Sequence, residues 1–567
     1  RTAMGGRLIR AWMERPLLSP VQISRRQQAV GDLVENSIAR QELSAALREV
    51  TDLERLIGRV VYGSAGGRDL SALCAGLGKL PYIRQLLSPC PSALLRSLGQ
   101  QLDDLPQLRE LLGRALVDEP PFSVREGGFI RDGFDQEVDR LRHILQGGKG
   151  VIPEMEAREK EKTGIRTLKI GYNKVFGYYI EVSNSFKDQV PDTYIRKQTL
   201  VNGERFITQE LKDLEHEILT ASERVVALEY QLFTALREEI SAAAVRIQKT
   251  AAAVAELDAL VSFAAVAVRN NYCRPDVDES GVIEIQEGRH PVVERVLKDS
   301  LFVPNHTFMG EKEERVAIIT GPNMAGKSTY MRQVALIVLM AQMGSFVPAA
   351  HAHIGVVDRI FTRIGASDDL SAGQSTFMVE MTEVAELLKN ATAKSLLILD
   401  EIGRGTSTYD GMSIARAVLE FCADKKRLGA KTLFATHYHE LTALEGQIPG
   451  VKNYNIAAKK KKDDILFLRK IVRGGADQSY GIEVAKLAGV PDRVIRRART
   501  ILEELESGSG VLPAGGPALP ADGEQVSLMD LGSQTVLKKL RMTDVNILSP
   551  IEALNLLAEL KQDLQES

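Results

Sequence analysis

The chain has 567 residues, too many for one hydrophobic core, so several domains are expected. Its composition of 44% hydrophobic and 26% charged residues is that of an ordinary soluble protein, and a formal net charge of -3 excludes a globally basic nucleic-acid binder. Because only 5% of the residues are aromatic, extensive stacking on unpaired bases is excluded as well.

Residues 1–150 are rich in Leu, Ala, Arg and Glu, with apolar residues at helical spacing, as at Leu43 and Leu47. This pattern predicts a helical domain. Helical spacing returns over the long stretch from Gln209 to Asn270, and we place the second helical domain at residues 211–274. We therefore expect two long helical blocks.

Residues 151–210, between these blocks, change character. In the segment Thr167–Val182, two short β-rich runs flank Asn173-Lys174, which is a hairpin signal. We expect a small sheet-bearing insertion at the tip of a helical hairpin. On the residues alone, a plain coiled-coil spacer is the alternative.

Residues 275–506 alternate apolar β runs with helical segments, which is the pattern of a parallel α/β sheet. The runs are Val316–Thr320, Leu396–Leu399 and Thr432–Ala435. The sequence therefore predicts a multidomain α and α/β protein.

Two further segments complete the chain. Residues 507–535 begin with a Gly-, Pro- and Ser-rich stretch, which predicts a flexible linker. Residues 536–567 contain an amphipathic pattern over Pro550–Leu564. One short helix is not stable alone, so we expect it to pack on another copy of the chain as an oligomerisation segment.

The cysteines favour a reducing compartment. They are scattered, with no Cys-x-x-Cys pair and no His at metal-ligand spacing, which is typical of core thiols in a cytoplasmic protein. They are Cys74, Cys90, Cys273 and Cys422. The longest apolar run, around Val334–Ala341, is too short to span a bilayer and predicts a buried helix. Because the chain starts at Arg1 rather than Met, we expect a fragment of a longer protein, and a lost leader stays open.

The strongest motif lies between the apolar run that ends at Thr320 and an expected helix over Tyr330–Met340. It consists of Gly321, Pro322, Asn323, Met324, Ala325, Gly326, Lys327, Ser328 and Thr329. This is the G-x-x-x-x-G-K-[ST] phosphate loop in its strand-loop-helix setting. Its backbone N–H groups and the helix N-terminus attract phosphate oxygens. We expect Lys327 to reach the β- and γ-phosphates of ATP, and the Ser328 hydroxyl to ligate Mg²⁺.

A pair of carboxylates follows the apolar run Leu396–Leu399. Asp400 is expected at the carboxyl edge of the sheet beside the phosphate loop, where it can hold Mg²⁺ through water. Glu401 is then placed to polarise the attacking water. A plain surface carboxylate is the alternative, and the companion loop disfavours it.

A histidine, His437, follows the run Thr432–Ala435. At the end of a neighbouring strand it can sense or stabilise the γ-phosphate, although a lone His has many purely structural explanations. Another small-residue turn lies in Asp368–Glu380, where Ser375-Thr376 resembles the N-cap of a helix. Since one phosphate loop already serves the local nucleotide, we infer that Ser375 faces a nucleotide held by a second subunit. An ordinary capped helix is the alternative.

Together these motifs resemble the ABC-type ATPases and, within that class, the MutS family of DNA mismatch-repair proteins. Inside the ATPase the resemblance is carried by Thr320–Arg332, Asp368–Met381, Asp400–Gly411 and Phe434–His437. Outside it, the matching segments are Met4–Pro16, Tyr172–Val182, Arg196–Ile207, Glu287–Glu294 and Ser479–Ile482. The resemblance therefore covers nearly the whole chain.

The resemblance implies a lever of long helices, a DNA-gripping clamp at the lever tip and a P-loop ATPase head that dimerises. ATP and Mg²⁺ are the implied cofactors. Asn323, Lys327 and Ser328 would bind phosphates, while Asp400 and Glu401 would serve Mg²⁺ and hydrolysis. His437 would face the γ-phosphate, Ser375 would reach the partner's ATP, and Phe302 would stack on the adenine.

The β insertion gains a role from the resemblance, as a contact for the phosphates of duplex DNA that does not read sequence. Its candidate residues are Asn173, Lys174, Arg196, Lys197, Asn202 and Arg205. On residue types alone, a solvated charged face is the better interpretation, and only the resemblance reverses it.

The resemblance also implies partners. Besides DNA and a second copy, as a homodimer or tetramer, these are a MutL-type repair protein and the replication sliding clamp. The segment Gln525–Leu531 resembles the short peptide that docks on that clamp. A nucleoid-associated cytoplasmic location without membrane contact follows.

Two departures from the family pattern stand out. The mismatch-reading domain, with its Phe-x-Glu wedge, and the connector after it have no counterpart here, so this chain is expected to lack mismatch discrimination. Within Phe467–Ile471, Arg469 stands where relatives commonly have His near the adenine.

The favoured hypothesis is that the chain is an ATP-dependent mismatch-repair protein that grips DNA as a dimer. The alternative is a DNA-bridging or recombination-control scaffold ATPase of the same superfamily without mismatch reading. A transporter ATPase subunit fits poorly because lever and clamp have no place in it.

Overall fold

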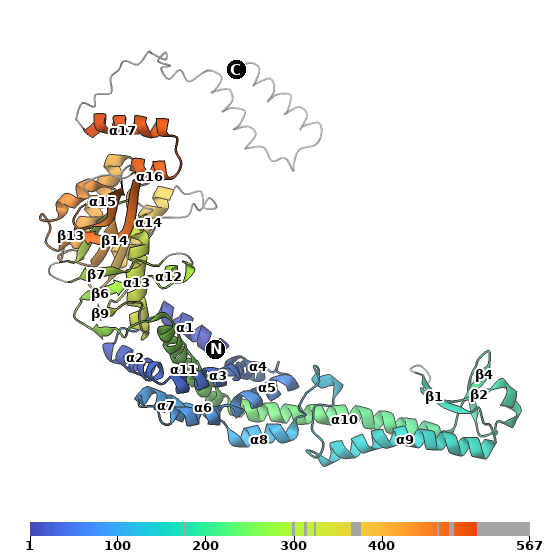
Figure 1. Ribbon diagram of the computed structural model, residues 1–567. Helices are drawn as coiled ribbons and strands as arrows, with labels where there is room; N and C mark the ends of the chain where they lie inside the picture. The colour runs from blue at the N-terminus through green and yellow to red at the C-terminus, as the bar shows by residue number, and fades with distance from the viewer. Residues whose placement is uncertain are drawn as a thin grey trace, which may run out of the picture. The chain divides into compact units, whose positions relative to one another are not determined.

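The structure is a computed structural model, shown in Figure 1, that describes residues 1–173, 177–297, 301–310, 314–322, 325–364, 376–461, 464–475 and 481–506. The chain forms two compact units, Arg1–Gly481 and Ile482–Ser567. Both expected domains beyond residue 506, the linker 507–535 and the segment 536–567, lie outside the described residues.

A helical body opens the first unit. Its helices are α1 (Ala3–Glu14), α2 (Pro20–Glu35), α3 (Ser37–Arg48), α4 (Leu53–Val61), α5 (Gly67–Gly78), α6 (Leu80–Leu87), α7 (Ala93–Gln101) and α8 (Pro106–Ala115). They surround α11 (Ala244–Asn270), which contacts α1, α2, α3, α4 and α7. By length and composition α11 could cross a membrane, yet 61% of its apolar window is buried, so core packing accounts for that composition. The helical structure predicted for this region is confirmed.

Two long helices, α9 (Gln136–Thr163) and α10 (Gln209–Ala242), extend side by side from the helical body (Figure 1). The two helices pack against each other through a small apolar cluster that includes Val138 and Val225. α9 runs unbroken through residue 150, where the sequence suggested a domain boundary. Helical spacing alone could not place this boundary, because the periodicity continues into the arm that carries the insertion.

A four-stranded antiparallel sheet lies at the far end of this helix pair (Figure 1). Its strands are β1 (Lys169–Asn173), β2 (Gly177–Ser183), β3 (Ile195–Thr199) and β4 (Gly203–Ile207), in the order β1-β2-β4-β3, with the short helix η2 (Asn184–Gln189) after β2. β1 and β2 pair as the predicted hairpin, which is thereby confirmed. Alternate residues such as Ile180 and Val182 bury one face of the sheet against the ends of α9 and α10.

The α/β part contains a six-stranded sheet among its described residues. Its strands are β8 (Val316–Thr320), β10 (Ile360–Arg363), β11 (Leu396–Asp400), β12 (Lys431–Ala435), β13 (Val451–Lys461) and β14 (Asp464–Arg473), in the order β10-β11-β12-β8-β13-β14. All pairings are parallel except that of β13 with β14. The predicted parallel sheet is thus confirmed, with an antiparallel strand added at one edge.

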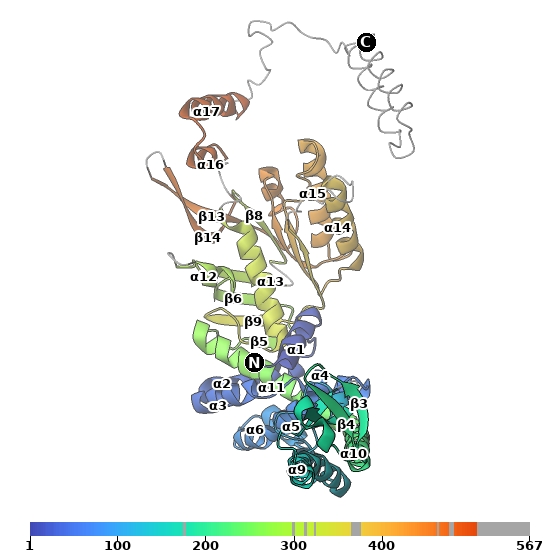
Figure 2. The ribbon, with the colours of Figure 1, turned by 90° about the vertical axis from the view of Figure 1, so that its right-hand side faces the viewer.

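Helices cover both faces of this sheet (Figure 2). α13 (Lys327–Met343) packs between it and a smaller sheet, while α14 (Thr376–Asn390) and α15 (Thr408–Ala423) cover the other face. The smaller sheet has the order β5-β9-β6-β7, formed by β5 (Asp276–Asp278), β6 (Ile283–Gly288), β7 (Asn305–Met309) and β9 (His351–Gly355), and α12 (Val293–Val296) follows β6. The predicted buried helix is therefore confirmed as α13, and it begins three residues earlier than expected, at Lys327.

The second unit is described only as far as Glu506. It contains most of α16 (Gly481–Leu487) and all of α17 (Asp492–Glu506), which an ion pair joins between Arg499 and Glu483 at 3.6 Å.

Candidate nucleotide-binding site

The phosphate loop joins β8 to α13 at the carboxyl edge of the large sheet. β8 is buried at every position, and α13 starts directly at Lys327. Gly321 has φ +126 and Gly326 has φ +106, a backbone conformation that side chains rarely tolerate, so the loop needs glycine at both ends. The start of a 17-residue helix therefore faces this loop, as an anion site requires. Asn323 and Met324 lie outside the described residues.

Lys327 is fully buried. Its ammonium donates a hydrogen bond to the carbonyl of Gly321 and lies 4.0 Å from Glu401 Oε1. Burial lowers the pKa of Lys327, while the carboxylates of Glu401 and Asp400 favour its charged form. The cation therefore stands between the loop and the two expected acids.

Ser328 and Asp400 meet directly, because the Ser328 hydroxyl donates to Asp400 Oδ2 at 2.5 Å. Asp400 is buried, its pKa is raised by that burial, and its Oδ1 has no hydrogen-bond partner within the described chain. A hydroxyl beside an unsatisfied carboxylate oxygen is a donor set that suits Mg²⁺. The described residues contain no group of three or more His, Cys, Asp or Glu side chains that could hold a metal ion.

Glu401 follows Asp400 in a left-handed backbone conformation, with φ +57. Such strain in a non-glycine residue tends to persist at functional sites. Its Oε1 lies 2.5 Å from Nε2 of His437, and its Oε2 accepts a hydrogen bond from Arg404 at 2.5 Å. Burial opposes ionisation, but His437, Arg404 and Lys327 outweigh it and lower the pKa of Glu401 to about 2. The carboxylate is therefore an anion at neutral pH.

His437 lies just beyond the carboxyl end of β12, which pairs with both β8 and β11. The structure thus brings together the histidine, both carboxylates and the phosphate loop from three neighbouring strands. Rather than standing alone, the imidazole contacts Glu401. The sequence suggested both residues separately, but not this contact.

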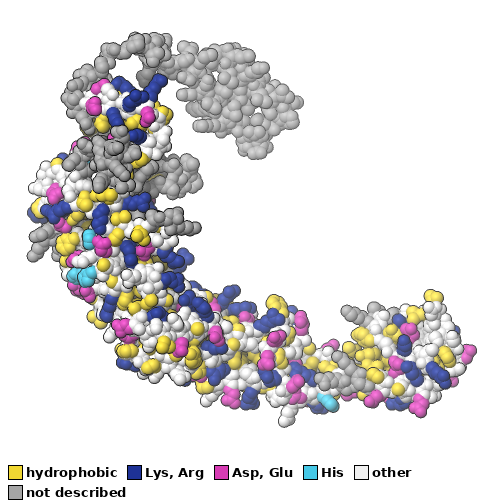
Figure 3. Space-filling model, in the orientation of Figure 1, with side chains coloured by type: hydrophobic (Ala, Val, Ile, Leu, Met, Phe, Trp, Pro, Cys, Tyr) yellow, Lys and Arg dark blue, Asp and Glu magenta, His cyan; other side chains and the backbone are white. Residues whose placement is uncertain are grey.

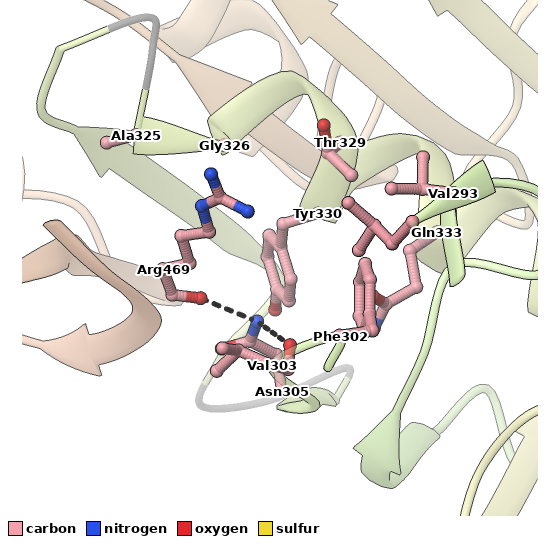
Figure 4. Close-up of a pocket in the computed structure, with 11 residues that line it drawn as sticks. Val293, Phe302, Val303, Asn305, Ala325, Gly326, Thr329, Tyr330, Gln333 and Arg469 are labelled. Carbon is pink, nitrogen blue, oxygen red and sulfur yellow. Dashed lines mark hydrogen bonds between the residues drawn. The ribbon is translucent and has the colours of Figure 1, made fainter. Parts of the chain in front are cut away.

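A cavity of about 250 Å³ adjoins the phosphate loop (Figure 4). It is lined by Val293, Leu297, Phe302, Val303, Asn305, Ala325, Gly326, Thr329, Tyr330, Gln333 and Arg469. Phe302, the suggested adenine-stacking residue, and Arg469, the departure from the family pattern, both belong to this wall. Asn305 fixes the backbone of Arg469 by donating to its carbonyl at 3.1 Å.

Gln333 is a lining residue that sequence reasoning missed. It is fully buried, and neither atom of its amide has a hydrogen-bond partner within the described residues. The signal available was its place four residues after Thr329, because positions four apart share one face of a helix. The pocket thus combines an aromatic ring, a guanidinium and an amide, groups that suit a purine base.

The trans-acting candidate, Ser375, lies outside the described residues. Helix α14 begins at the next residue, Thr376, where the sequence placed the start of a capped helix.

The suggested DNA-binding residues differ in their surroundings. Asn173 ends β1, and Lys174 lies outside the described residues. Lys197 and Asn202 are exposed, and Lys197 sits at an irregularity where the register of β3 against β4 shifts. Arg196 is exposed as well, although it contacts Glu204 at 3.1 Å.

Arg205 is more enclosed than Arg196, Lys197 and Asn202. Its guanidinium contacts Glu181 at 3.1 Å, donates to Gln198 at 3.0 Å and lies 4.0 Å from the ring centre of Tyr179. These contacts stabilise the outer face of the sheet. The sequence could not reveal them, because they join three different strands.

Comparison with known proteins gives a consistent result along the chain. The family description "MutS domain III" matches residues 1–264, and "MutS domain V" matches residues 317–506. A DNA mismatch repair protein MutS from Lachnoclostridium phytofermentans is 58% identical over 89% of this chain and 54% of its own length. Proteins of the same name from Ruminiclostridium cellulolyticum and Symbiobacterium thermophilum are each 54% identical, over 99% and 100% of this chain and 65% of their own lengths. The chain thus spans between about half and two thirds of these curated relatives.

Proposed function

The chain belongs to the MutS family, and from this we propose that it is the ATP-hydrolysing, DNA-gripping part of a DNA mismatch-repair protein. The MutS domain V that it contains is the ATPase domain of the family. The relatives cited above are named DNA mismatch repair proteins, which favours repair over a recombination scaffold.

One observation carries the enzymatic part of this proposal, namely the contact of Ser328 with Asp400 beside the phosphate loop. Lys327 and the loop N–H groups bind the phosphates of ATP, and Ser328 and Asp400 hold Mg²⁺. When bound, Mg²⁺ neutralises charge on the β- and γ-phosphates. Glu401 orients and polarises the attacking water, while His437 stands beside it to face the γ-phosphate.

The base is held in the adjoining cavity. Phe302 stacks on the adenine, and Arg469 and Gln333 belong to the same cavity wall.

The hydrolytic site is composite. The chain has one phosphate loop, and a second run of small residues precedes α14 in the sequence. We propose that Ser375, in this run, reaches ATP held by a second copy of the chain. Two protomers then close two nucleotide sites, as expected for a symmetric dimer. Closure would be transmitted along α9 and α10 to the distal sheet, because packed helices are stiff enough to carry such a change.

Mixing two inactive variants tests the composite site. Lys327→Met removes the phosphate-binding cation, and Ser375→Ala removes the trans hydroxyl. Each variant alone should hydrolyse ATP poorly, but random pairing should restore about a quarter of the wild-type rate, since half the dimers regain one intact site. Steady-state phosphate release after co-refolding measures this. A mixture no more active than its components would contradict the composite site.

The four-stranded sheet and its helices form the proposed DNA clamp. On the face shown in Figure 3, basic and acidic side chains are interspersed over this part of the chain, so grip comes from individual exposed cations rather than a uniform basic face. Lys197 and the polar Asn202 are both exposed, and Lys174, outside the described residues, would join them. Arg205, held by Glu181 and Tyr179, shapes the clamp and contributes less direct contact with phosphate.

Lys197→Ala is expected to weaken binding of duplex DNA about threefold to tenfold at moderate salt, independent of sequence. The slope of log affinity against log salt should fall by about one, because one phosphate contact is lost. Fluorescence anisotropy with a labelled duplex over a salt series measures both. The control is Lys249→Ala, an exposed lysine of α11 in the helical body. An unchanged slope for Lys197→Ala would contradict a phosphate contact at this residue.

The remaining partners are part of the same proposal. A MutL-type protein would bind the ATP-bound dimer. The segment Gln525–Leu531, outside the described residues, would dock on the sliding clamp. Residues 536–567 would join copies of the chain, and the protein would act in the cytoplasm on the nucleoid.

A further inference from the structure

Gly403, two residues after Glu401, forms hydrogen bonds with side chains through both its N–H and its carbonyl group. Its N–H donates to Glu380 Oε1 at 2.6 Å, and its carbonyl accepts a hydrogen bond from the Tyr438 hydroxyl at 3.0 Å. Glu380 belongs to α14, while Tyr438 follows His437 beyond β12. Two elements that are distant in sequence therefore form hydrogen bonds with the turn that follows Glu401.

A third element closes the remaining side of Gly403. A Cβ atom at this position, where φ is +86, would lie 2.3 Å from the carbonyl oxygen of Gly411 in α15. A Cβ at Gly411 would lie 2.4 Å from the Tyr438 hydroxyl oxygen. Both glycines are therefore needed for close packing, and the turn has no room to shift towards α15.

The carboxylate that holds Gly403 is buried and charge-paired. Glu380 is 5% exposed, and its Oε2 lies 3.7 Å from Nη2 of Arg363, itself 5% exposed. Arg363 ends β10 and also contacts Glu383, one turn further along α14, at 3.0 Å. A buried carboxylate is costly unless it is paired, so the N–H of Gly403 and the nearby guanidinium of Arg363 favour this position of the Glu380 side chain.

We propose that Glu380 and Tyr438 are positioning residues for Glu401. By fixing Gly403, they hold the turn in which Glu401 and Gly403 both have positive φ, and this turn aims the Glu401 carboxylate at the nucleotide. Glu380 also ties this turn to the helix that begins directly after Ser375. The inference rests on the proposed ATPase function.

Glu380→Ala tests this link. Turnover should fall about 10- to 100-fold, since small displacements of a reacting group cost that much, while the affinity for ATP stays within about twofold because Lys327 and the phosphate loop are untouched. Glu380→Gln keeps an oxygen that accepts from Gly403 and should restore most of the turnover. Tyr438→Phe, which loses only the hydroxyl, should lower turnover about fivefold.

The matched control is Glu383→Ala. Glu383 also contacts Arg363, but its side chain is 52% exposed, so its loss should leave turnover within about twofold of wild type. Steady-state kinetics, binding of a fluorescent ATP analogue and thermal melting are measured for each variant. Full activity in Glu380→Ala, or parallel losses of turnover and ATP affinity that Gln does not rescue, would overturn the inference. A wild-type chain without ATPase activity would instead overturn the proposed function on which the inference rests.

Discussion

Glu401→Gln is expected to lower single-turnover ATP hydrolysis about 100- to 1,000-fold while ATP binding stays within about twofold of wild type. The amide keeps the size of the side chain but loses the charge that polarises water and contacts His437 and Arg404. Rapid-quench hydrolysis with enzyme in excess and equilibrium binding of a fluorescent ATP analogue separate the two steps.

Glu279→Gln serves as the control, because Glu279 is an exposed carboxylate elsewhere in the α/β part. Undiminished hydrolysis by Glu401→Gln would show that Glu401 is not the water-activating group. A parallel loss of ATP binding would mean that the side chain supports the phosphate loop instead.

The low pKa of Glu401 also decides how its charge depends on pH. Burial raises the pKa of Glu401, but the opposing effects of His437, Arg404 and Lys327 are larger together, and the pKa falls to about 2. The anion is therefore fully present two or more pH units above that value, and it is lost only as the pH falls through it. A group with so low a pKa is a weak proton acceptor at neutral pH, so we expect its negative charge to act by orienting and polarising the water.

Much of this site could be inferred from the sequence because its parts are local. The phosphate loop needs glycines and a lysine at fixed spacing, and a buried strand delivers Asp400 to the same sheet edge. Parallel strands place their carboxyl ends together, which is why His437 could be assigned to the same region. Each of these inferences requires only one segment and its neighbouring strand.

The parts that the sequence could not supply depend on tertiary contacts. The hydrogen bond between Glu380 and Gly403 joins residues that are 23 positions apart, with the strand β11 between them in sequence. The contact of Arg205 with Glu181 joins two strands of the distal sheet. The same limit applies to the fold, in which helical spacing runs on through residue 150 because that residue lies inside α9. Periodicity identifies the type of an element, whereas packing decides where a domain ends.

Lys327→Met is expected to weaken ATP binding about 100-fold or more, because charge-assisted hydrogen bonds to phosphate are among the strongest available and this ammonium is buried in the loop. The change has a second consequence for the acids nearby. Without the cation, Asp400 loses a charge that lowers its pKa, so this buried carboxylate should become harder to ionise and bind Mg²⁺ less well.

The two effects of Lys327→Met can be separated by experiment. Titration calorimetry with ATP in excess Mg²⁺ reports the loss of phosphate contacts, and the Mg²⁺ concentration needed for half-maximal ATP binding reports the change at Asp400. Lys389→Met, an exposed lysine on α14, should change neither quantity. If Lys327→Met bound ATP as tightly as wild type, the buried ammonium would be a structural partner of Glu401 and not a phosphate ligand. The loop would then have to hold the triphosphate through its backbone N–H groups alone, which the burial of a lysine among two carboxylates argues against.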